Sequence, residues 1–368
     1  MDKVRAGVVG VGSMGTSHAG CLVQGKVDNV ELTAIYDASP ERLETVRKMF
    51  PGAKPFNSPD EMFSSGCVDG VIIATPHYQH PPIAIKAFEK GLHVLTEKPA
   101  GVYTRQVREM NEAAEKSGKV FSIMFQLRTQ PVYSKAKELI ESGELGEIKR
   151  LVWICTSWYR SQSYYDSGSW RGTWEGEGGG VLLNQAPHQL DLWQWFCGVP
   201  QRVYAFCGFG KYRNIEVEDD VTIYGEYENG AECTFIASVA EAPGTNRLEI
   251  SGDRGKIVIE DNNLAFCRLR VPESRFNRES RNMFGAPECW RCEVPLSGGS
   301  PTHANILNNW VNAILKGEPL VAPGEEGINS LQISNAAYLS AWTNGWVDIP
   351  VDEDLFYDKL NDRIKNKT

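Results

Sequence analysis

The fold of this chain is decided by the stretch VRAGVVGVGSMG at residues 4–15. An apolar run at residues 4–9 has the character of a buried strand, and three glycines follow it in the spacing G-x-G-x-x-G. The first glycine permits a tight turn, the second lets a pyrophosphate approach, and the third allows close packing of helix and strand. Helical N–H groups then bind the phosphates. We therefore predict a dinucleotide-binding turn made of Gly10, Gly12, Ser13, Met14 and Gly15.

An acidic residue stands where such a turn needs a ribose ligand. Asp37 ends the second apolar run, Glu31–Tyr36, about 20 positions after the last glycine. Its carboxylate can accept hydrogen bonds from the ribose 2′-hydroxyl and repels a 2′-phosphate, so NAD is favoured over NADP. Arg42 argues for NADP, because an arginine there can accommodate the 2′-phosphate. Alternatively, Arg42 lies on a solvated face of the following helix. Both residues belong to the predicted cofactor set.

Composition places the chain among soluble globular proteins with two domains. It has 368 residues, 42% hydrophobic and 23% charged, and a net charge of −9. This acidity argues against a nucleic-acid partner, which would need a basic surface. The first residues lead straight into a strand without a signal-like apolar segment, and no apolar stretch approaches the roughly 18–20 residues that span a bilayer. We expect a cytoplasmic protein that is not membrane-bound.

Two patterns divide the chain. Residues 1–125 alternate strands and helices, which predicts a Rossmann domain with a doubly wound parallel sheet. Residues 126–368 contain strands at hairpin spacing, which predicts a substrate-binding α/β domain with a large, mainly antiparallel sheet. The helices expected to cover one face of this sheet are Pro187–Phe196, His303–Leu315 and Gly327–Thr343. The other face of the sheet is expected to be open and to form the interface of a homo-oligomer, a dimer or tetramer.

The nine cysteines are scattered, and only Cys289 and Cys292 form a C-x-x-C pair. A single pair without a second one is weak support for zinc. We interpret the two residues as strand positions on a connecting segment, and we expect no metal.

A lysine and a histidine carry the chemistry. Lys98 follows an apolar run. Asn184, His188 and Asp191 are spaced i, i+4 and i+7, so these three residues share one face if the segment is helical. An imidazole suits removal of a hydroxyl proton as hydride leaves the carbon. A partly desolvated lysine can stabilise charge on the substrate oxygen. Alone, each residue would be interpreted as a loop lysine or a structural histidine.

Together these motifs resemble the glucose–fructose oxidoreductase/inositol dehydrogenase/rhizopine-catabolism (Gfo/Idh/MocA) family over nearly the whole chain. The resemblance implies an N-terminal Rossmann domain and a C-terminal α/β domain whose open sheet commonly makes the oligomer interface. The motifs that carry it are the turn at 10–15, ATPHYQH at 74–80, TEKP at 96–99, GGG at 178–180 and the set Asn184, His188 and Asp191.

The same resemblance assigns roles to residues. Lys98 and His188 would be the catalytic pair, with Glu97 near the nicotinamide ribose. Many members have aspartate where this chain has Asn184, and an amide cannot take a proton at neutral pH. His188 is therefore expected to be the only base, while Asn184 holds a substrate hydroxyl or orients the histidine. The cofactor pocket would be lined by Thr75, Pro76 and His80.

The stretch at residues 157–174 is dense in tryptophan, tyrosine and arginine. Aromatic faces with hydroxyl and guanidinium donors suit a carbohydrate; the alternative is a surface loop packed on the sheet edge. Arg171 could contact either substrate or cofactor. The stretch resembles members that act on sugars and glycosides, including bacterial enzymes that oxidise a glycoside at its C3 hydroxyl. The predicted substrate residues are Lys98, Tyr159, Tyr165, Trp170, Arg171, Asn184 and His188.

These observations predict an NAD-dependent oxidoreductase. It would transfer a hydride between a ring hydroxyl or keto group of a sugar, glycoside or cyclitol and the nicotinamide. One alternative is a redox-neutral glycosidase or epimerase of the same family that uses tightly held NAD. Another is a non-catalytic dinucleotide-binding regulatory protein, although such a protein would need neither Lys98 nor His188.

Overall fold

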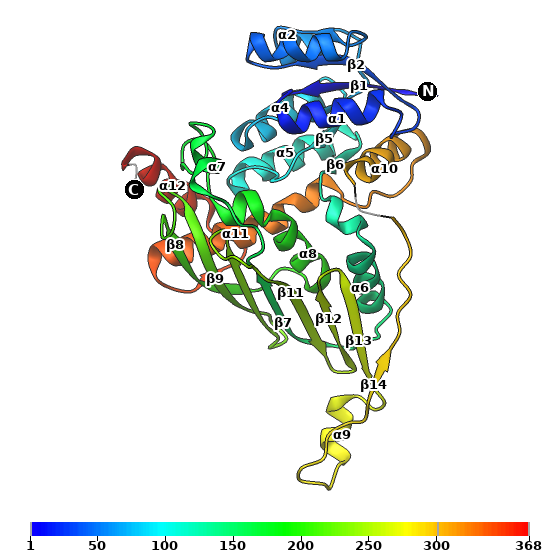
Figure 1. Ribbon diagram of the computed structural model, residues 1–368, viewed down its shortest axis with the longest axis vertical. Coiled ribbons are helices and arrows are strands. Elements are labelled where there is room, and N and C mark those ends of the chain that lie inside the picture. The colour runs from blue at the N-terminus through cyan, green and yellow to red at the C-terminus, as the bar shows by residue number, and fades with distance from the viewer. Residues whose placement is uncertain (1, 300–301, 367–368) are drawn as a thin grey trace. The chain divides into compact units, whose positions relative to one another are not determined.

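The computed structural model describes residues 2–299 and 302–366, which fall into two compact units (Figure 1). Unit 1 comprises Met1–Thr129, Gly176–Gly178 and Pro301–Leu331. Unit 2 comprises Gln130–Glu175, Gly179–Ser300 and Gln332–Thr368.

Unit 1 is built on a parallel sheet of six strands in the order β3-β2-β1-β4-β5-β6. This is the Rossmann order, in which the strand order reverses between β1 and β4. The central strands are almost fully buried, which explains their continuous apolar sequences. The fold class predicted for this part is confirmed. The strands are β1 (Val4–Val9), β2 (Val30–Tyr36), β3 (Lys54–Pro55), β4 (Gly70–Ile73), β5 (His93–Thr96) and β6 (Phe121–Ile123).

Capping residues bound several helices of unit 1. The Ser39 and Ser58 side chains accept hydrogen bonds from the first turns of α2 and α3, and Gly118 ends α5 with a left-handed φ of 62°. The helices are α1 (Ser13–Val23), α2 (Pro40–Met49), α3 (Pro59–Ser64), α4 (His80–Glu89), α5 (Thr104–Ser117) and α10 (His303–Lys316).

The position of α10 corrects one expectation. This helix was expected to cover the second sheet, but it contacts α1 and β1 in unit 1. Trp310 on α10 lies against Gly70 at the start of β4, where any side chain on that glycine would collide with the indole ring. Sequence order placed α10 after the second sheet, and periodicity alone does not say which sheet an apolar helix face covers.

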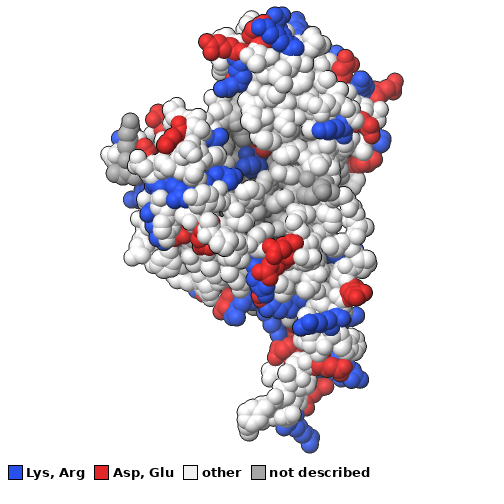
Figure 2. Space-filling model, in the orientation of Figure 1, with Lys and Arg blue, Asp and Glu red and all other residues white. Residues whose placement is uncertain are grey.

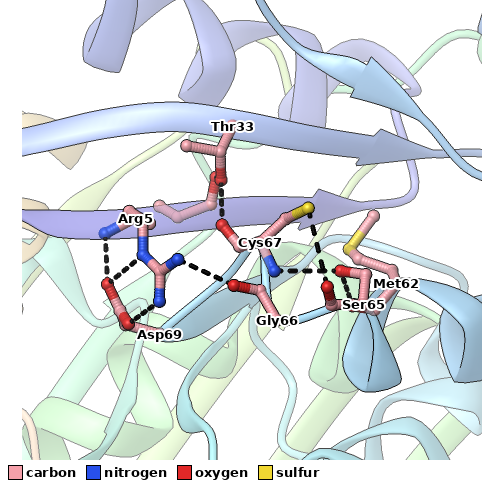
Figure 3. A network of polar contacts seen from close by, with 8 residues as sticks. Arg5, Thr33, Met62, Ser65, Gly66, Cys67 and Asp69 are labelled. Atoms are coloured by element: carbon pink, nitrogen blue, oxygen red, sulfur yellow. Dashed lines mark hydrogen bonds and ion pairs between the residues drawn. The ribbon is translucent and has the colours of Figure 1, made fainter.

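A polar network fixes the amino-terminal end of the unit 1 sheet (Figure 3). Arg5 on β1 donates to both carboxylate oxygens of Asp69, at 2.6 and 3.0 Å, and to the carbonyl oxygen of Gly66 at 2.7 Å. Thr33 on β2 donates to the carbonyl oxygen of Cys67 at 2.9 Å. The segment that leads into β4 is thereby tied to β1 and β2, at the end of the sheet away from the glycine turn.

Unit 2 contains a sheet of nine strands in the order β14-β13-β12-β11-β7-β10-β9-β8-β15. Only β7 and β10 pair in parallel, so the prediction of a mainly antiparallel sheet is confirmed. The strands are β7 (Ile148–Cys155), β8 (Arg202–Phe209), β9 (Glu218–Glu226), β10 (Glu232–Ser238), β11 (Asn246–Gly252), β12 (Gly255–Glu260), β13 (Asn263–Leu269), β14 (Cys289–Cys292) and β15 (Val347–Asp348).

One face of this sheet holds the core of unit 2. Trp193 on α8 stacks on Phe235 of β10 with ring centroids 5.7 Å apart, and Trp153 of β7 is fully buried beside them. This contact anchors α8 to the sheet. The helices are α6 (Pro131–Glu141), α7 (Gln162–Asp166), α8 (Pro187–Cys197), α9 (Glu273–Glu279), α11 (Gly327–Thr343), which begins in unit 1, and α12 (Glu353–Asn366).

Two further findings bear on earlier expectations. All nine cysteines are unpaired, and Cys289 and Cys292 lie on β14, as their interpretation as strand residues predicted. Within residues 2–299 and 302–366, no helix combines the length and apolar character needed to cross a membrane.

The Arg5–Asp69 pair generates a stability prediction. Its hydrogen bonds lower the pKa of Asp69, so the ionised carboxylate stabilises the fold above the ordinary pKa of aspartate, near 4, and this contribution is lost as the pH falls through the lowered value. Because Arg5 is half exposed, we expect Asp69→Asn to lower the free energy of unfolding at pH 7 by only about 1–2 kcal/mol.

Urea unfolding followed by circular dichroism measures this loss. Glu31→Gln is the matched control, because Glu31 lies in the same sheet and its contact with Lys3 is long and solvent-exposed. The difference between Asp69→Asn and the wild type should shrink in acid. Equal stability of the two proteins at pH 7 would contradict the prediction.

Candidate active site

The glycine turn between β1 and α1 has the shape that a dinucleotide requires. Gly10 has a φ of 88°, and a Cβ on Gly15 would lie 1.8 Å from the carbonyl oxygen of Gly10, so neither position accepts a side chain. A Cβ on Gly12 would meet open space, which is where a pyrophosphate approaches. Gly12 caps α1 without a side-chain hydrogen bond. These residues therefore fit the phosphates of a dinucleotide.

Asp37 lies beside this turn. Its carboxylate is largely buried and accepts hydrogen bonds from the main-chain N–H groups of Val11 and Ser39, each at 2.9 Å. The Arg42 guanidinium approaches it to 3.3 Å and is about half exposed. The carboxylate is thus fixed by the backbone of the turn itself, and Arg42 sits at its outer side. The structure brings these two predicted cofactor residues together with Gly10 and Gly12.

The loop after β4 contributes Thr75, Pro76 and His80. His80 is buried and bridges two carbonyl oxygens, that of Pro99 at 2.8 Å from Nδ1 and that of Thr75 at 2.7 Å from Nε2. Burial lowers the pKa of the His80 imidazole, while the two carbonyl groups oppose that shift. His80 therefore ties the loop after β4 to the loop after β5. The buried Thr75 hydroxyl has no hydrogen-bond partner in the described part of the chain, as expected if a bound group completes its surroundings.

Glu97 and Lys98 end β5 at the same edge of the sheet. Glu97 is buried, one carboxylate oxygen lies 2.7 Å from Nε2 of His18, and the other accepts from the main-chain N–H of Lys98. Burial opposes ionisation, but the hydrogen bond from His18 and neighbouring positive charges outweigh it and lower the pKa of Glu97 to about 2. An ionised carboxylate is therefore held next to half-buried Lys98.

His18 is a residue that the sequence reasoning missed. It lies on α1, is fully buried, and its ring contacts that of His303 edge to face at 5.5 Å. The available signal was its place one helical turn after Gly15, on the side of α1 that packs on the sheet. Burial lowers the pKa of His303.

In unit 2, a buried carboxylate holds the glycine-rich loop that leads to His188. Glu218 accepts hydrogen bonds from the N–H groups of Gly180 and Leu182 and from the Tyr338 hydroxyl, all at 2.8 Å. A Cβ on Gly180 would lie 1.9 Å from the Glu218 carbonyl oxygen, and one on Gly179 would lie 2.4 Å from the Tyr338 hydroxyl. The glycines are therefore required by close packing around Glu218. Burial raises the pKa of Glu218 to about 7.

Asn184 and His188 do not share one continuous helix. Asn184 lies in a π-helical turn, η3 (Val181–Gln185), and His188 lies in the first turn of α8, after Pro187. The conditional placement of both on a single α-helical face is therefore wrong, because the hydrogen bonds to Glu218 shape the chain before α8 into a separate turn. His188 is largely buried, and Asn184 is half-buried.

The aromatic stretch is organised around Tyr164, which the sequence reasoning did not single out. Its hydroxyl oxygen accepts from Arg171 at 2.7 Å and from the Asn184 amide at 3.2 Å. The structure thus brings together Asn184, Arg171 and Trp170, whose ring contacts the Arg171 guanidinium. Tyr165 is buried, and Tyr159 is about half exposed under the guanidinium of Arg213.

Comparison with known proteins identifies the chain. Residues 4–125 match the model of the oxidoreductase family with an NAD-binding Rossmann fold, and residues 133–258 match the GFO/IDH/MocA C-terminal domain. The chain belongs to the Gfo/Idh/MocA family. The family resemblance seen in the sequence is thereby confirmed, and this Gfo/Idh/MocA protein is an oxidoreductase whose first unit binds NAD.

Individual relatives agree with this assignment. Scyllo-inositol 2-dehydrogenase (NAD(+)) of Bacillus subtilis is 28% identical over 264 residues, which cover 70% of this chain and 74% of the relative. An uncharacterised oxidoreductase of Streptococcus pneumoniae is 34% identical over 70% of this chain and 68% of its own length. The WlbA dehydrogenase of Bordetella pertussis, solved with NADH and UDP-GlcNAcA, has a TM-score of 0.79 at 28% identity and covers 95% of this chain and 100% of its own.

The Glu218 contacts predict how the activity of this Gfo/Idh/MocA protein changes when Glu218 is replaced by glutamine. Glu218→Gln replaces a carboxylate oxygen by an NH₂ group, which must face a donor, so one hydrogen bond to the loop is lost. Since a lost bond to a charged group costs about 1.5–3 kcal/mol, kcat/KM should fall about 10–100-fold. Steady-state kinetics measure this, with Glu226→Gln on the same strand as control.

Calorimetry on the same variant should show unchanged affinity for NAD, because Glu218 belongs to unit 2. Its unfolding provides a second readout. A raised pKa means that ionised Glu218 destabilises the fold, so wild-type stability should decline from about pH 4.5 to pH 7 more than that of the variant. Wild-type kcat/KM in Glu218→Gln would show that the carboxylate does not position the loop.

Proposed function

We propose that this protein is an NAD-dependent dehydrogenase that acts on a ring hydroxyl of a sugar, glycoside or cyclitol, or on the corresponding keto group. The observation that carries the proposal is the setting of Lys98, next to an ionised buried Glu97 at the carboxyl edge of an NAD-binding Rossmann sheet. Relatives named as inositol dehydrogenases and a WlbA structure with NADH and UDP-GlcNAcA support the substrate class. Asp37 supports NAD over NADP.

In the proposed reaction, the protein supplies proton transfer and orientation. His188 takes the hydroxyl proton, because Asn184, four residues before it in the sequence, cannot act as a base. Lys98 donates a hydrogen bond to the substrate oxygen and stabilises its developing charge. Bound NAD supplies the hydride acceptor. Asn184, which donates to Tyr164, orients the substrate. The remaining predicted contacts, from Thr75, Pro76, Glu97, Tyr159, Tyr165 and Trp170, are part of this proposal.

We also propose that the protein works in the cytoplasm as a homo-oligomer. Nine unpaired cysteines are typical of a reducing compartment. The outer face of the unit 2 sheet presents aromatic side chains, among them Phe206, which is 64% exposed, and Trp346, whose ring contacts Tyr204 and Tyr224. An apolar face of this kind favours self-association.

Light scattering should give a molecular mass that is a multiple of 41.0 kDa, and Phe206→Asp should reduce that mass. A monomeric wild type would refute the assembly.

The function is tested by following NADH absorbance with a panel of sugars, glycosides and cyclitols, with NAD and NADP in parallel. We expect Lys98→Met to lower kcat on any substrate found by about 10²–10³-fold, the range for loss of one donor that stabilises charge on the substrate oxygen, while the affinity for NAD is kept. Lys90→Met, an exposed lysine after α4, is the control.

Two outcomes would count against the proposal. Wild-type turnover in Lys98→Met would remove that residue from the mechanism. Turnover of a glycoside without NADH, with cofactor retained through purification, would favour the redox-neutral alternative. Because Lys98 and His188 belong to different units, a double variant tests their joint action: its loss in kcat should be much smaller than the product of the single losses.

A further inference from the structure

Two arginines converge on the ring of Tyr164 in unit 2. The Arg171 guanidinium lies 4.4 Å from the ring centroids of both Tyr164 and Trp170, and it donates to the Tyr164 hydroxyl at 2.7 Å. The Arg160 guanidinium lies 5.1 Å from the Tyr164 ring and 5.6 Å from that of Trp158. Stacking holds each planar group by its faces and leaves N–H donors along its edges.

Within the described part of the chain, neither guanidinium has an acidic partner. In the described ranges 2–299 and 302–366, no Asp or Glu oxygen lies within 4.0 Å of an Arg160 or Arg171 nitrogen. Their hydrogen bonds go to neutral oxygens, the hydroxyl of Tyr164 and the carbonyl of Tyr159, and Nε of Arg160 is buried with no partner among these residues. Asp166, the acidic residue of the same stretch, accepts from Gln162 instead.

This arrangement stands out in an acidic chain. Acidic residues outnumber basic ones by 47 to 38, and many arginines elsewhere pair with carboxylates, as Arg5, Arg150, Arg202 and Arg247 do, although the neighbouring Arg213 also donates only to carbonyl oxygens. Figure 2 shows both basic and acidic side chains on the visible face around the region where Figure 1 places α7. Two neighbouring cations without counter-ions repel each other, and an anion between or beside them would relieve this repulsion.

The arginines are coupled to the candidate active site through one hydroxyl group. The Tyr164 oxygen that accepts from Arg171 also accepts from the side-chain amides of Asn184, at 3.2 Å, and Gln185, at 3.5 Å. Asn184 lies in the turn that leads directly to His188. Only the Tyr164 side chain would therefore separate an anion bound at the arginines from Asn184, the residue proposed to orient the substrate.

We propose that Arg160 and Arg171 bind an anionic group on the carbohydrate, so that the substrate is an acidic sugar or cyclitol; this rests on the proposed function. A carboxylate and a phosphate monoester both match the planar N–H edges of arginine. A ring that bears such a group several atoms from the reacting hydroxyl would bind in one orientation, because the anion fixes one end.

The test compares matched compounds on the wild type loaded with NAD. Glucose, glucuronate and glucose 6-phosphate form one set, and galactose, galacturonate and galactose 6-phosphate a second. Calorimetry measures binding and NADH absorbance measures turnover. At least one acid or phosphate should bind about tenfold or more tightly than its neutral parent; the arm that shows the gain separates a carboxylate from a phosphate. Equal or weaker binding of every anionic compound would overturn the proposal.

Variants locate the effect. Arg171→Gln and Arg160→Gln should each raise the KM for the anionic substrate about tenfold or more relative to any change in the KM for its neutral parent, so that the preference for the anion is lost while the affinity for NAD is kept. Arg171→Lys keeps the charge and should lose less, so it controls for misfolding. Arg202→Gln is the matched control, since Arg202 also stacks on an aromatic ring, that of Trp346, but pairs with Glu226.

The outcomes separate this proposal from the proposed function. Loss of NAD affinity in Arg171→Gln, with unchanged affinity for the acid, would assign the arginine to the dinucleotide and overturn the inference. Tight, arginine-dependent binding of an acid without NADH formation would keep the anion subsite and overturn the dehydrogenase. Oxidation of neutral sugars without preference for acids would keep the dehydrogenase and overturn the anion subsite.

Discussion

The hydrogen bond of 2.7 Å between His18 and the buried carboxylate of Glu97 is the constraint on which the candidate residues of unit 1 depend. A buried carboxylate is stable as an anion only if donors compensate its lost hydration. His18 supplies one donor and the main chain of Lys98 supplies another, so satisfying Glu97 also fixes the backbone that carries Lys98. His80 secures the next residue, Pro99, to the loop after β4.

Unit 2 also surrounds a buried acidic side chain with donors, although burial there outweighs them and raises the pKa of Glu218 to about 7. Glu218 gathers two main-chain N–H groups and a tyrosine hydroxyl, and this sets the loop and the π-helical turn that precede His188. The absence of side chains at Gly179 and Gly180 makes this possible, because the carboxylate and its strand lie against the loop backbone. In each unit, the candidate residues thus stand next to a buried acidic side chain that holds backbone in place.

The sequence predicted what depends on local pattern. The glycine spacing and the apolar runs are local, and the structure shows the glycine turn and the parallel sheet where they were expected. Contacts between distant residues were not predictable in this way. His18, Tyr164 and Glu218 act through partners 79, 20 and 38 positions away, and their immediate sequence does not reveal which residues those partners are. The helix α10 was assigned to the wrong sheet for the same reason.

The central claim is that hydride leaves a ring carbon of a carbohydrate and reaches NAD. The most direct measurement uses a substrate that carries deuterium on its ring carbons and analyses the reduced cofactor by mass spectrometry. The account predicts that one deuterium appears in NADH for each molecule oxidised, with none from solvent. Reduced cofactor without deuterium, or substrate conversion without any reduced cofactor, would contradict it.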